Sequence, residues 1–447
     1  MNNDCALYDR FDSESIVNFA KRLVGHSLRD LISCDNIPIY LGKGKLGQLV
    51  EEHYFNYSCN SLSEPDFHEV GIELKTVPLK IVRDGKLVAK ERLVLSMIDY
   101  MEEYKNDFEN SKVVKKASKL LLLFYLHDSD KDDVDLLFKH VVLWEFPETD
   151  LQIIKQDWNT IIDKIRQGKA HELSEGDTLY LGACTKSTNS SIRRKQPYSD
   201  ILAKPRAFSL KQKYVNHILE ESMEYRSASN TSSVLAMSED IYIKSFEEII
   251  FEKFSPYFGL TYNQITQILN IPISNAKHKY KILCNNIMGA RGNRIEEFDK
   301  ADIQMKTIRV EADGRVKESM SFENIDYCEI INEEWEESMI FDAFTKRFLF
   351  VIFKEQEGDY RLHNLMFWTM PPVDLEKAKE FWEDTKNRII NDDYDHFISM
   401  KDDRCFHVRP KGRNNEDLAT SPSGRLVPKK CFWINNSYIR NIVENVK

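Results

Sequence analysis

Residues 71–80 read GIELKTVPLK, and this run gives the strongest indication of the fold and of the site. Apolar and charged residues alternate at the start of this run, which predicts a β-strand over 71–80. In a strand, the side chains of Glu73 and Lys75 point to the same face. Asp66 precedes them by a few positions, after a break at Pro65. The stretch therefore fits a D-x(n)-E-x-K pattern, which gathers two carboxylates and one amine.

This pattern suits metal-assisted hydrolysis of a phosphodiester bond. Magnesium prefers oxygen ligands and usually takes one or two carboxylates together with waters and substrate phosphate. We therefore expect Asp66 and Glu73 to hold Mg²⁺, which polarises the phosphate and lowers the pKa of a bound water. Lys75 would orient or deprotonate that water. A lone E-x-K is also common on solvent-exposed strands. The flanking sequence must therefore distinguish a nuclease site from an ordinary exposed strand.

The segment before this strand predicts a glycine-rich entry into a helix. Residues 42–47 read GKGKLG, and the helical run 48–52 that follows contains Glu51. The glycine-rich piece is not a nucleotide-binding P-loop, because that motif ends in G-K-[ST] whereas Gly47 is followed by Gln48 and Leu49.

Together, the helix entry, the turn at Asp66 and the run GIELKTVP resemble the MutH family of endonucleases. That family comprises the mismatch-repair nicking endonuclease and the two-domain type II restriction enzymes of the Sau-three-A type. The second branch is the nearer match. The resemblance implies an α/β fold, a restriction-endonuclease-like mixed sheet flanked by helices, present as two tandem copies. It also implies Mg²⁺-dependent cutting of duplex DNA at GATC.

The resemblance further implies a catalytic set: Glu51, Asp66, Glu73, Lys75 and Lys116. Lys116 is chosen because it precedes the apolar run 120–124 by four residues, as a family lysine does; Lys119 is the alternative.

The second half of the chain repeats the first in order. The run DIQMKTIRV at 302–310 matches 71–79, a glycine turn at 313–315 matches 84–86, and Lys346 matches Lys119. We therefore predict a catalytic domain at 1–222, a linker at 223–237 and a degenerate copy at 238–447. The linker is rich in Ser, Ala and Asn.

The second copy lacks the metal-binding pattern. Gln304 replaces Glu73, Glu297 falls opposite Asp66, and Lys306 stands where the first copy has Lys75. A lysine without paired carboxylates can still meet a phosphate, so we expect this copy to bind DNA without cutting it.

Composition and charge set further limits. A chain of 447 residues with 42% apolar residues suits two globular domains, and its scattered cysteines form neither a disulfide framework nor a zinc motif. No apolar run is long enough to span a bilayer, and the polar, acidic start does not predict a signal peptide. We therefore expect a cytoplasmic protein that has no membrane partner.

A net charge of −10 disfavours DNA binding only weakly, because a cleft needs just local positive potential. Basic residues concentrate at 186–213 and 404–440. The candidate DNA contacts are Lys186, Arg206, Lys306, Arg409 and Lys411. Arg409-Pro410-Lys411 resembles the family's R-P-K loop, whereas a solvated basic face is the alternative for either segment.

Three other functions stay open on the sequence: a nicking endonuclease acting on hemimethylated DNA, a sequence-specific DNA-binding protein without catalysis, and a DNA-repair or transposon-linked nuclease with a different target. The expected partners are double-stranded DNA, a cognate DNA methyltransferase and a second copy of the chain on DNA. Further elements are predicted as helices over 13–32 and near 151–168, and as strands over 86–97, 119–126 and 178–184.

Overall fold

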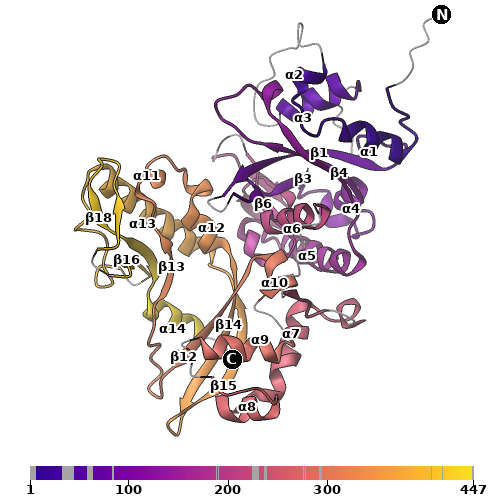
Figure 1. Cartoon of the computed structure of the whole chain (residues 1–447). Helices are drawn as coiled ribbons and strands as arrows, with labels where there is room; N and C mark the ends of the chain where they lie inside the picture. Colours follow the sequence, from indigo (N-terminus) through magenta and orange to yellow (C-terminus); the bar gives the residue numbers. More distant parts are fainter. Residues whose placement is uncertain are drawn as a thin grey trace, which may run out of the picture. The chain divides into compact units, whose positions relative to one another are not determined.

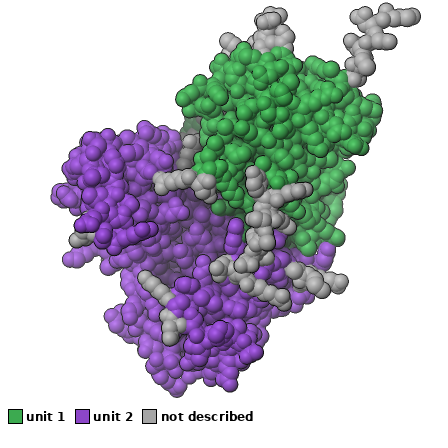
Figure 2. Space-filling view, in the orientation of Figure 1, with its two compact units in different colours: residues 1–173, 177–229, 299–301 green, residues 174–176, 230–298, 302–447 purple. Residues whose placement is uncertain are grey.

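The computed structural model describes residues 7–32, 45–57, 64–82, 85–187, 189, 191–223, 231–235, 239–274, 276, 278–290, 294–403, 405–414 and 416–444. The chain divides into two compact units (Figure 2). Unit 1 comprises residues 1–173, 177–229 and 299–301, and unit 2 comprises 174–176, 230–298 and 302–447. The glycines at 42 and 44 and most of the predicted linker lie outside the described residues.

Two sheets form the framework of unit 1 (Figure 1). Its strands are β1 (Ile72–Ile81), β2 (Leu87–Ala89), β3 (Leu93–Met97), β4 (Lys119–Leu126), β5 (Phe138–Trp144), β6 (Leu181–Thr185), β7 (Arg194–Gln196), β8 (Ser199–Ala203) and β9 (Arg206–Leu210). The first sheet has the order β2-β1-β4-β5, with β1 parallel to β4 and the other pairs antiparallel. The second sheet, β3-β9-β6, is antiparallel, and β7 pairs with β8.

Helices cover these sheets. They are α1 (Ser13–Lys21), α2 (Leu28–Leu31), α3 (Lys45–Leu49), α4 (Lys112–Ala117), α5 (Glu148–Arg166) and α6 (Gln212–Ser222), and a π-helical turn, η1 (Val50–Tyr54), continues α3. The helix predicted over 13–32 is interrupted, because Gly25 adopts φ +86° between α1 and α2. Apolar side chains of α1 and α3 share a core with Ile72 and Leu74 of β1. The alternation of the strand therefore turns Glu73 and Lys75 to the opposite face.

The second half of the chain repeats this plan. Its strands are β10 (Thr231–Ser232), β11 (Arg294–Ile295), β12 (Ile303–Val310), β13 (Met320–Asn324), β14 (Arg347–Gln356), β15 (Asp359–Trp368), β16 (Phe406–Pro410), β17 (Leu418–Thr420), β18 (Leu426–Pro428) and β19 (Lys430–Ile434). Its helices are α7 (Phe246–Phe254), α8 (Tyr262–Ile268), α9 (Lys279–Ile287), α10 (Glu296–Ala301), α11 (Tyr327–Ile330), α12 (Met339–Thr345), α13 (Pro372–Ile390) and α14 (Asn436–Glu444). The sheets β12-β14-β15 and β13-β19-β16 and the hairpin β17-β18 correspond to those of unit 1.

The repeat extends to strand register. Ile72 of β1 pairs with Lys119 of β4, and Ile303 of β12 pairs with Arg347 of β14. Gln304 and Lys306 therefore occupy the positions of Glu73 and Lys75, as predicted. The same register corrects one detail, since Lys119 corresponds to Arg347 and not to Lys346.

The antiparallel sheets agree in the same way. Ala207 of β9 pairs with both Met97 and Cys184, and Cys431 of β19 pairs with both Asn324 and Arg409. The predicted α/β fold with mixed sheets in two tandem copies is therefore confirmed. Within the described residues, no helix combines the length and apolar character that crossing a bilayer requires.

Candidate active site

Strand β1 brings a buried carboxylate together with two lysines. Glu73 is 1% exposed, and Lys75 Nζ donates a hydrogen bond to its Oε1 atom. Lys116 Nζ, from α4, lies 3.7 Å from the same oxygen. Lys119, the alternative in the sequence, instead lies 3.5 Å from Glu145. The structure thus brings Lys116, and not Lys119, beside Glu73.

A tight turn returns Asp66 to this strand. Gly71 adopts φ +70°, a conformation that glycine reaches without strain, and Phe67 N–H donates to Ile72 O at 2.9 Å across the turn. The backbone N–H of Leu74 donates to Asp66 Oδ2 at 2.9 Å, which fixes that carboxylate beside the strand. The chain segment between the two acids is therefore folded so that the two carboxylates lie close to each other.

The electrostatics of Glu73 reflect its burial. Burial raises the pKa of Glu73 above its ordinary value; the positive charge of Lys75 opposes this rise, and the neighbouring carboxylate of Asp66 adds to it. Glu73 Oε2 is buried and has no hydrogen-bond partner within the described structure. An unsatisfied buried acceptor costs about 1–3 kcal/mol, so this atom is suited to a bound cation.

The donor set fits a hard divalent cation. Two carboxylates, Asp66 and Glu73, offer oxygen ligands, as magnesium prefers. Among the described residues, no group of three or more His, Cys, Asp and Glu side chains is placed to enclose a metal ion. A site with two protein carboxylates leaves room for water and substrate phosphate, which Mg²⁺ normally retains.

Glu51 lies half-buried in the π-helical turn η1. The turn is marked by the hydrogen bond from Phe55 N–H to Val50 O, 3.0 Å long. Such turns occur often at functional sites. The helix before it packs close to β1, where a Cβ added at Gly47 would lie 3.5 Å from Thr76 Oγ1. The catalytic role of Glu51 stays a prediction.

Unit 2 does not reproduce the carboxylate pair. Gln304 stands in place of Glu73, and the carboxylate of Glu297 accepts hydrogen bonds from the N–H groups of Val234 and Leu235, both at 3.0 Å. The carboxylate of Glu297 is therefore engaged by the backbone of residues 234–235, and Gln304 supplies no carboxylate in place of Glu73.

Two predicted DNA contacts occupy equivalent exposed positions. Lys186 follows β6 and Lys411 follows β16, and their N–H groups donate to Pro205 O and Lys429 O, in both cases at 3.0 Å. The matching strand pairing and hydrogen bonds make Lys186 and Lys411 equivalent positions of the two copies. Both residues are exposed, and Lys411 Nζ donates to the backbone carbonyl of Phe322.

The guanidinium of Arg409 lies over the ring of Trp433, 3.8 Å from its centroid. Stacking of this kind holds the planar guanidinium in one orientation and leaves its edge free to bind phosphate or a base. Sequence reasoning missed Trp433, because its relation to Arg409 depends on the pairing of β16 with β19.

Arg206 has a different environment. Its terminal nitrogens donate to Ala183 O, at 2.5 Å, and to Leu173 O. Its counterpart Lys430 likewise donates to a backbone carbonyl, that of Tyr394. These contacts favour a role for Arg206 in holding the fold together.

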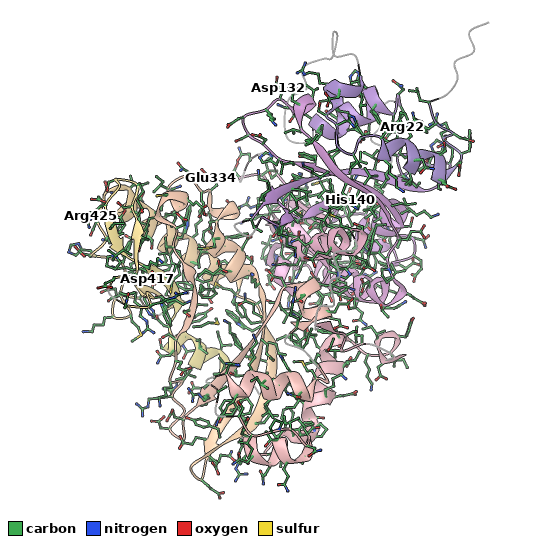
Figure 3. The ribbon with its side chains drawn as sticks, viewed as in Figure 1. Arg22, Asp132, His140, Glu334, Asp417 and Arg425 are labelled. Atoms are coloured by element: carbon green, nitrogen blue, oxygen red, sulfur yellow. The ribbon has the colours of Figure 1, made fainter. Side chains whose placement is uncertain are left out.

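Some basic residues of the C-terminal segment are already paired. Arg425 lies 3.2 Å from Asp392, and Lys429 forms an ion pair with Asp417 (Figure 3 labels Arg425 and Asp417). The basic segment is thus only partly available to DNA.

Comparison with known proteins follows the same division. The family model described as DNA mismatch repair enzyme MutH matches residues 55–157 and 289–380, once in each half of the chain. The type II restriction enzyme Sau3AI of Staphylococcus aureus is 33% identical over 97% of this chain and 98% of its own length. This chain belongs to the MutH-related type II restriction enzyme family. The family assignment agrees with the resemblance seen in residues 42–79.

The MutH proteins align with about half of this chain. The DNA mismatch repair protein MutH of Shewanella amazonensis is 27% identical over 47% of this chain and 96% of its own length. That of Haemophilus influenzae is 24% identical over 48% of this chain and 97% of its own length. One copy of the repeat is thus about the size of a whole MutH protein.

Proposed function

We propose that this chain is a Mg²⁺-dependent type II restriction endonuclease that hydrolyses phosphodiester bonds in duplex DNA at GATC. Unit 1 cuts, and unit 2 binds DNA without cutting. The observation that carries the proposal is the buried Glu73 beside Asp66, with an unsatisfied oxygen and two lysines next to it. The relative over nearly the whole chain is a type II restriction enzyme, which supports the same activity.

The side chains have distinct roles in this mechanism. Asp66 and Glu73 would hold Mg²⁺, which when bound supplies an acidified water and a positive charge beside the phosphate. Lys75 donates to Oε1 of Glu73, and its charge opposes the rise in the pKa of that carboxyl group. The same side chain is placed to orient the attacking water, or to take up its proton when the amine is neutral. Lys116 adds a second positive charge, which favours the developing negative charge on the phosphate.

Two alternatives are less well supported. A nicking enzyme of the MutH type would leave half of the chain without a role, because MutH proteins cover less than half of it. A DNA-binding protein without catalysis would leave the paired acids and the unsatisfied Glu73 oxygen unexplained.

Plasmid digestion tests the proposal. Wild-type protein should linearise unmethylated plasmid at GATC with Mg²⁺ and leave it intact in EDTA, and Glu73→Gln should not cut. Single-strand nicks confined to hemimethylated DNA would instead indicate the MutH-type activity. Tight binding without any cut would indicate a non-catalytic protein, and cuts at another sequence would overturn the GATC assignment.

The biological setting follows from this activity. An enzyme that cuts GATC requires protection of the host's own GATC sites, so we infer a cognate DNA methyltransferase that shares its cytoplasmic location. GATC is its own reverse complement, so two copies on DNA would present one cutting site to each strand. Size-exclusion chromatography with and without a GATC duplex tests this dimer, and a strictly monomeric complex that still cuts both strands would contradict it.

A further inference from the structure

Unit 2 collects lysines at the position where unit 1 collects carboxylates. Lys306 lies on β12, Lys281 on the helix α9 that packs against β12, and Lys346 directly before β14. Lys411 follows β16. All three neighbours lie near enough to Lys306 for their charges to act on it. The cluster therefore draws on four separate elements of one unit.

Little negative charge balances this cluster. Lys346 pairs with Asp302 at 3.1 Å, and Lys411 Nζ donates to the backbone carbonyl of Phe322. In the part of the chain that the structure describes, neither Lys281 nor Lys306 forms an ion pair with a carboxylate. Burial, together with repulsion from the three other lysines, lowers the pKa of Lys306. Without a bound ligand, such an arrangement lowers the stability of the folded protein, because like charges repel and a buried charge loses its hydration.

The corresponding lysine of unit 1 has the opposite surroundings. Lys75 donates to Glu73, and Asp66 lies beside that pair. In unit 2, Gln304 replaces Glu73, the carboxylate of Glu297 is bound to backbone N–H groups, and lysines surround Lys306, which changes a site for a cation into a site for an anion. A phosphate group would supply the charge that Lys306 and Lys281 lack, through charge-assisted hydrogen bonds.

We propose that Lys281, Lys306, Lys346 and Lys411 form a metal-independent binding site for a backbone phosphate of duplex DNA. This site occupies the place in unit 2 where unit 1 holds its metal and the phosphate to be cut. The inference rests on the proposed function in so far as unit 2 binds DNA, and it names the side chains and the part of DNA concerned.

Duplex binding by the full chain in EDTA tests this site. A short fluorescent duplex containing GATC should bind Lys306→Gln about tenfold more weakly than wild type, the loss expected for one charge-assisted contact. A plot of the logarithm of the association constant against the logarithm of the salt concentration should become shallower by about 0.9, because one phosphate contact is lost. Lys354→Gln, which removes the same charge elsewhere in the same sheet, should have a much smaller effect.

Thermal unfolding separates this role from a structural one. Because Lys306 lies among like charges, Lys306→Gln should raise the midpoint of unfolding without DNA and reduce the further rise that the duplex produces. A lysine that served only the fold would lower the midpoint when replaced. Stabilisation of wild type by inorganic phosphate, without an effect of Lys306 on duplex binding, would overturn the assignment to DNA.

The outcomes distinguish this inference from the proposed function. If wild type cuts GATC with Mg²⁺ but duplex binding in EDTA is the same for wild type and Lys306→Gln, the phosphate site is wrong and the cutting assignment stands. If wild type never cuts but its binding depends on Lys306, the cutting assignment is wrong and the phosphate site stands.

Discussion

Strands β1 and β12 have the same place in their sheets but carry opposite chemistry. Both run parallel to the next strand of their sheet in the same register, and both carry a lysine at the equivalent position. In β1 that lysine, Lys75, faces Glu73; in β12 the corresponding Lys306 has Gln304 two residues before it and three lysines nearby. The comparison teaches that sheet pairing and apolar packing maintain the fold, while a few polar positions determine whether a site holds a cation or an anion.

The largest difference between the units should appear when a metal ligand is removed. Asp66→Asn should reduce cutting below detection, because it removes one of the two carboxylates that hold the ion. Adding Gln304→Glu in unit 2 should not restore activity, since Glu297 is already bound to the backbone of Val234 and Leu235. Single-turnover digestion of a plasmid measures both variants. Cutting restored by Gln304→Glu would mean that unit 2 retains a latent metal site.

The two equivalent lysines should affect different steps. Lys75→Ala should slow the chemical step by roughly two to four orders of magnitude, the usual effect of losing a positioned acid–base or electrostatic group. Lys306→Ala should leave the single-turnover rate at saturating DNA close to that of wild type. Rapid-quench kinetics provide the comparison. Similar losses of rate for both variants would remove the distinction between a catalytic and a binding lysine.

A smaller effect is expected at the R-P-K loop of unit 2. Arg409→Ala combined with Lys411→Ala should weaken duplex binding about tenfold, because exposed charge-assisted contacts to DNA are lost. Trp433→Leu should weaken it less, by releasing the orientation of Arg409 that stacking provides. Glu380→Gln on α13 is the control. If the control and the double variant bind alike, the loop does not contact DNA.

The smallest effect concerns pH. Only ionised Glu73 can bind a cation, and burial raises its pKa, so cutting should decline as the pH falls through a value above that of an ordinary carboxyl group. Higher Mg²⁺ should shift this decline to lower pH, because the ion competes with the proton. Duplex binding measured in EDTA, which does not need the ion, should show no decline over the same pH range. A pH profile of cutting that Mg²⁺ leaves unchanged would contradict the role of Glu73.

Local patterns in the sequence predicted the central strands well. The strand expected over 71–80 is found at Ile72–Ile81, and the one expected over 119–126 has those bounds. The single strand expected over 86–97 is in fact two, because Leu87–Ala89 pairs with β1 whereas Leu93–Met97 pairs with β9. Residue patterns reveal that a segment is extended but not which distant strand it joins.

The same limit applies to the sites. Asp66 and Glu73 were predictable because a short turn brings them together, and their spacing is visible in the sequence. The cluster around Lys306 was not, because Lys281 and Lys411 reach it from elements that are far apart in the chain. The backbone contacts of Arg206 were equally hidden, since an arginine in a basic segment looks the same whether it faces solvent or carbonyl groups.

The most direct test gives unit 1 the residue that unit 2 already carries. Glu73→Gln should abolish Mg²⁺-dependent cutting of a GATC plasmid, while the same preparation should bind a GATC duplex in EDTA about as tightly as wild type. That result would show that one carboxylate separates the cutting copy from the binding copy. Cutting by Glu73→Gln at a rate near wild type would contradict the account, because the catalytic metal site would then lie elsewhere.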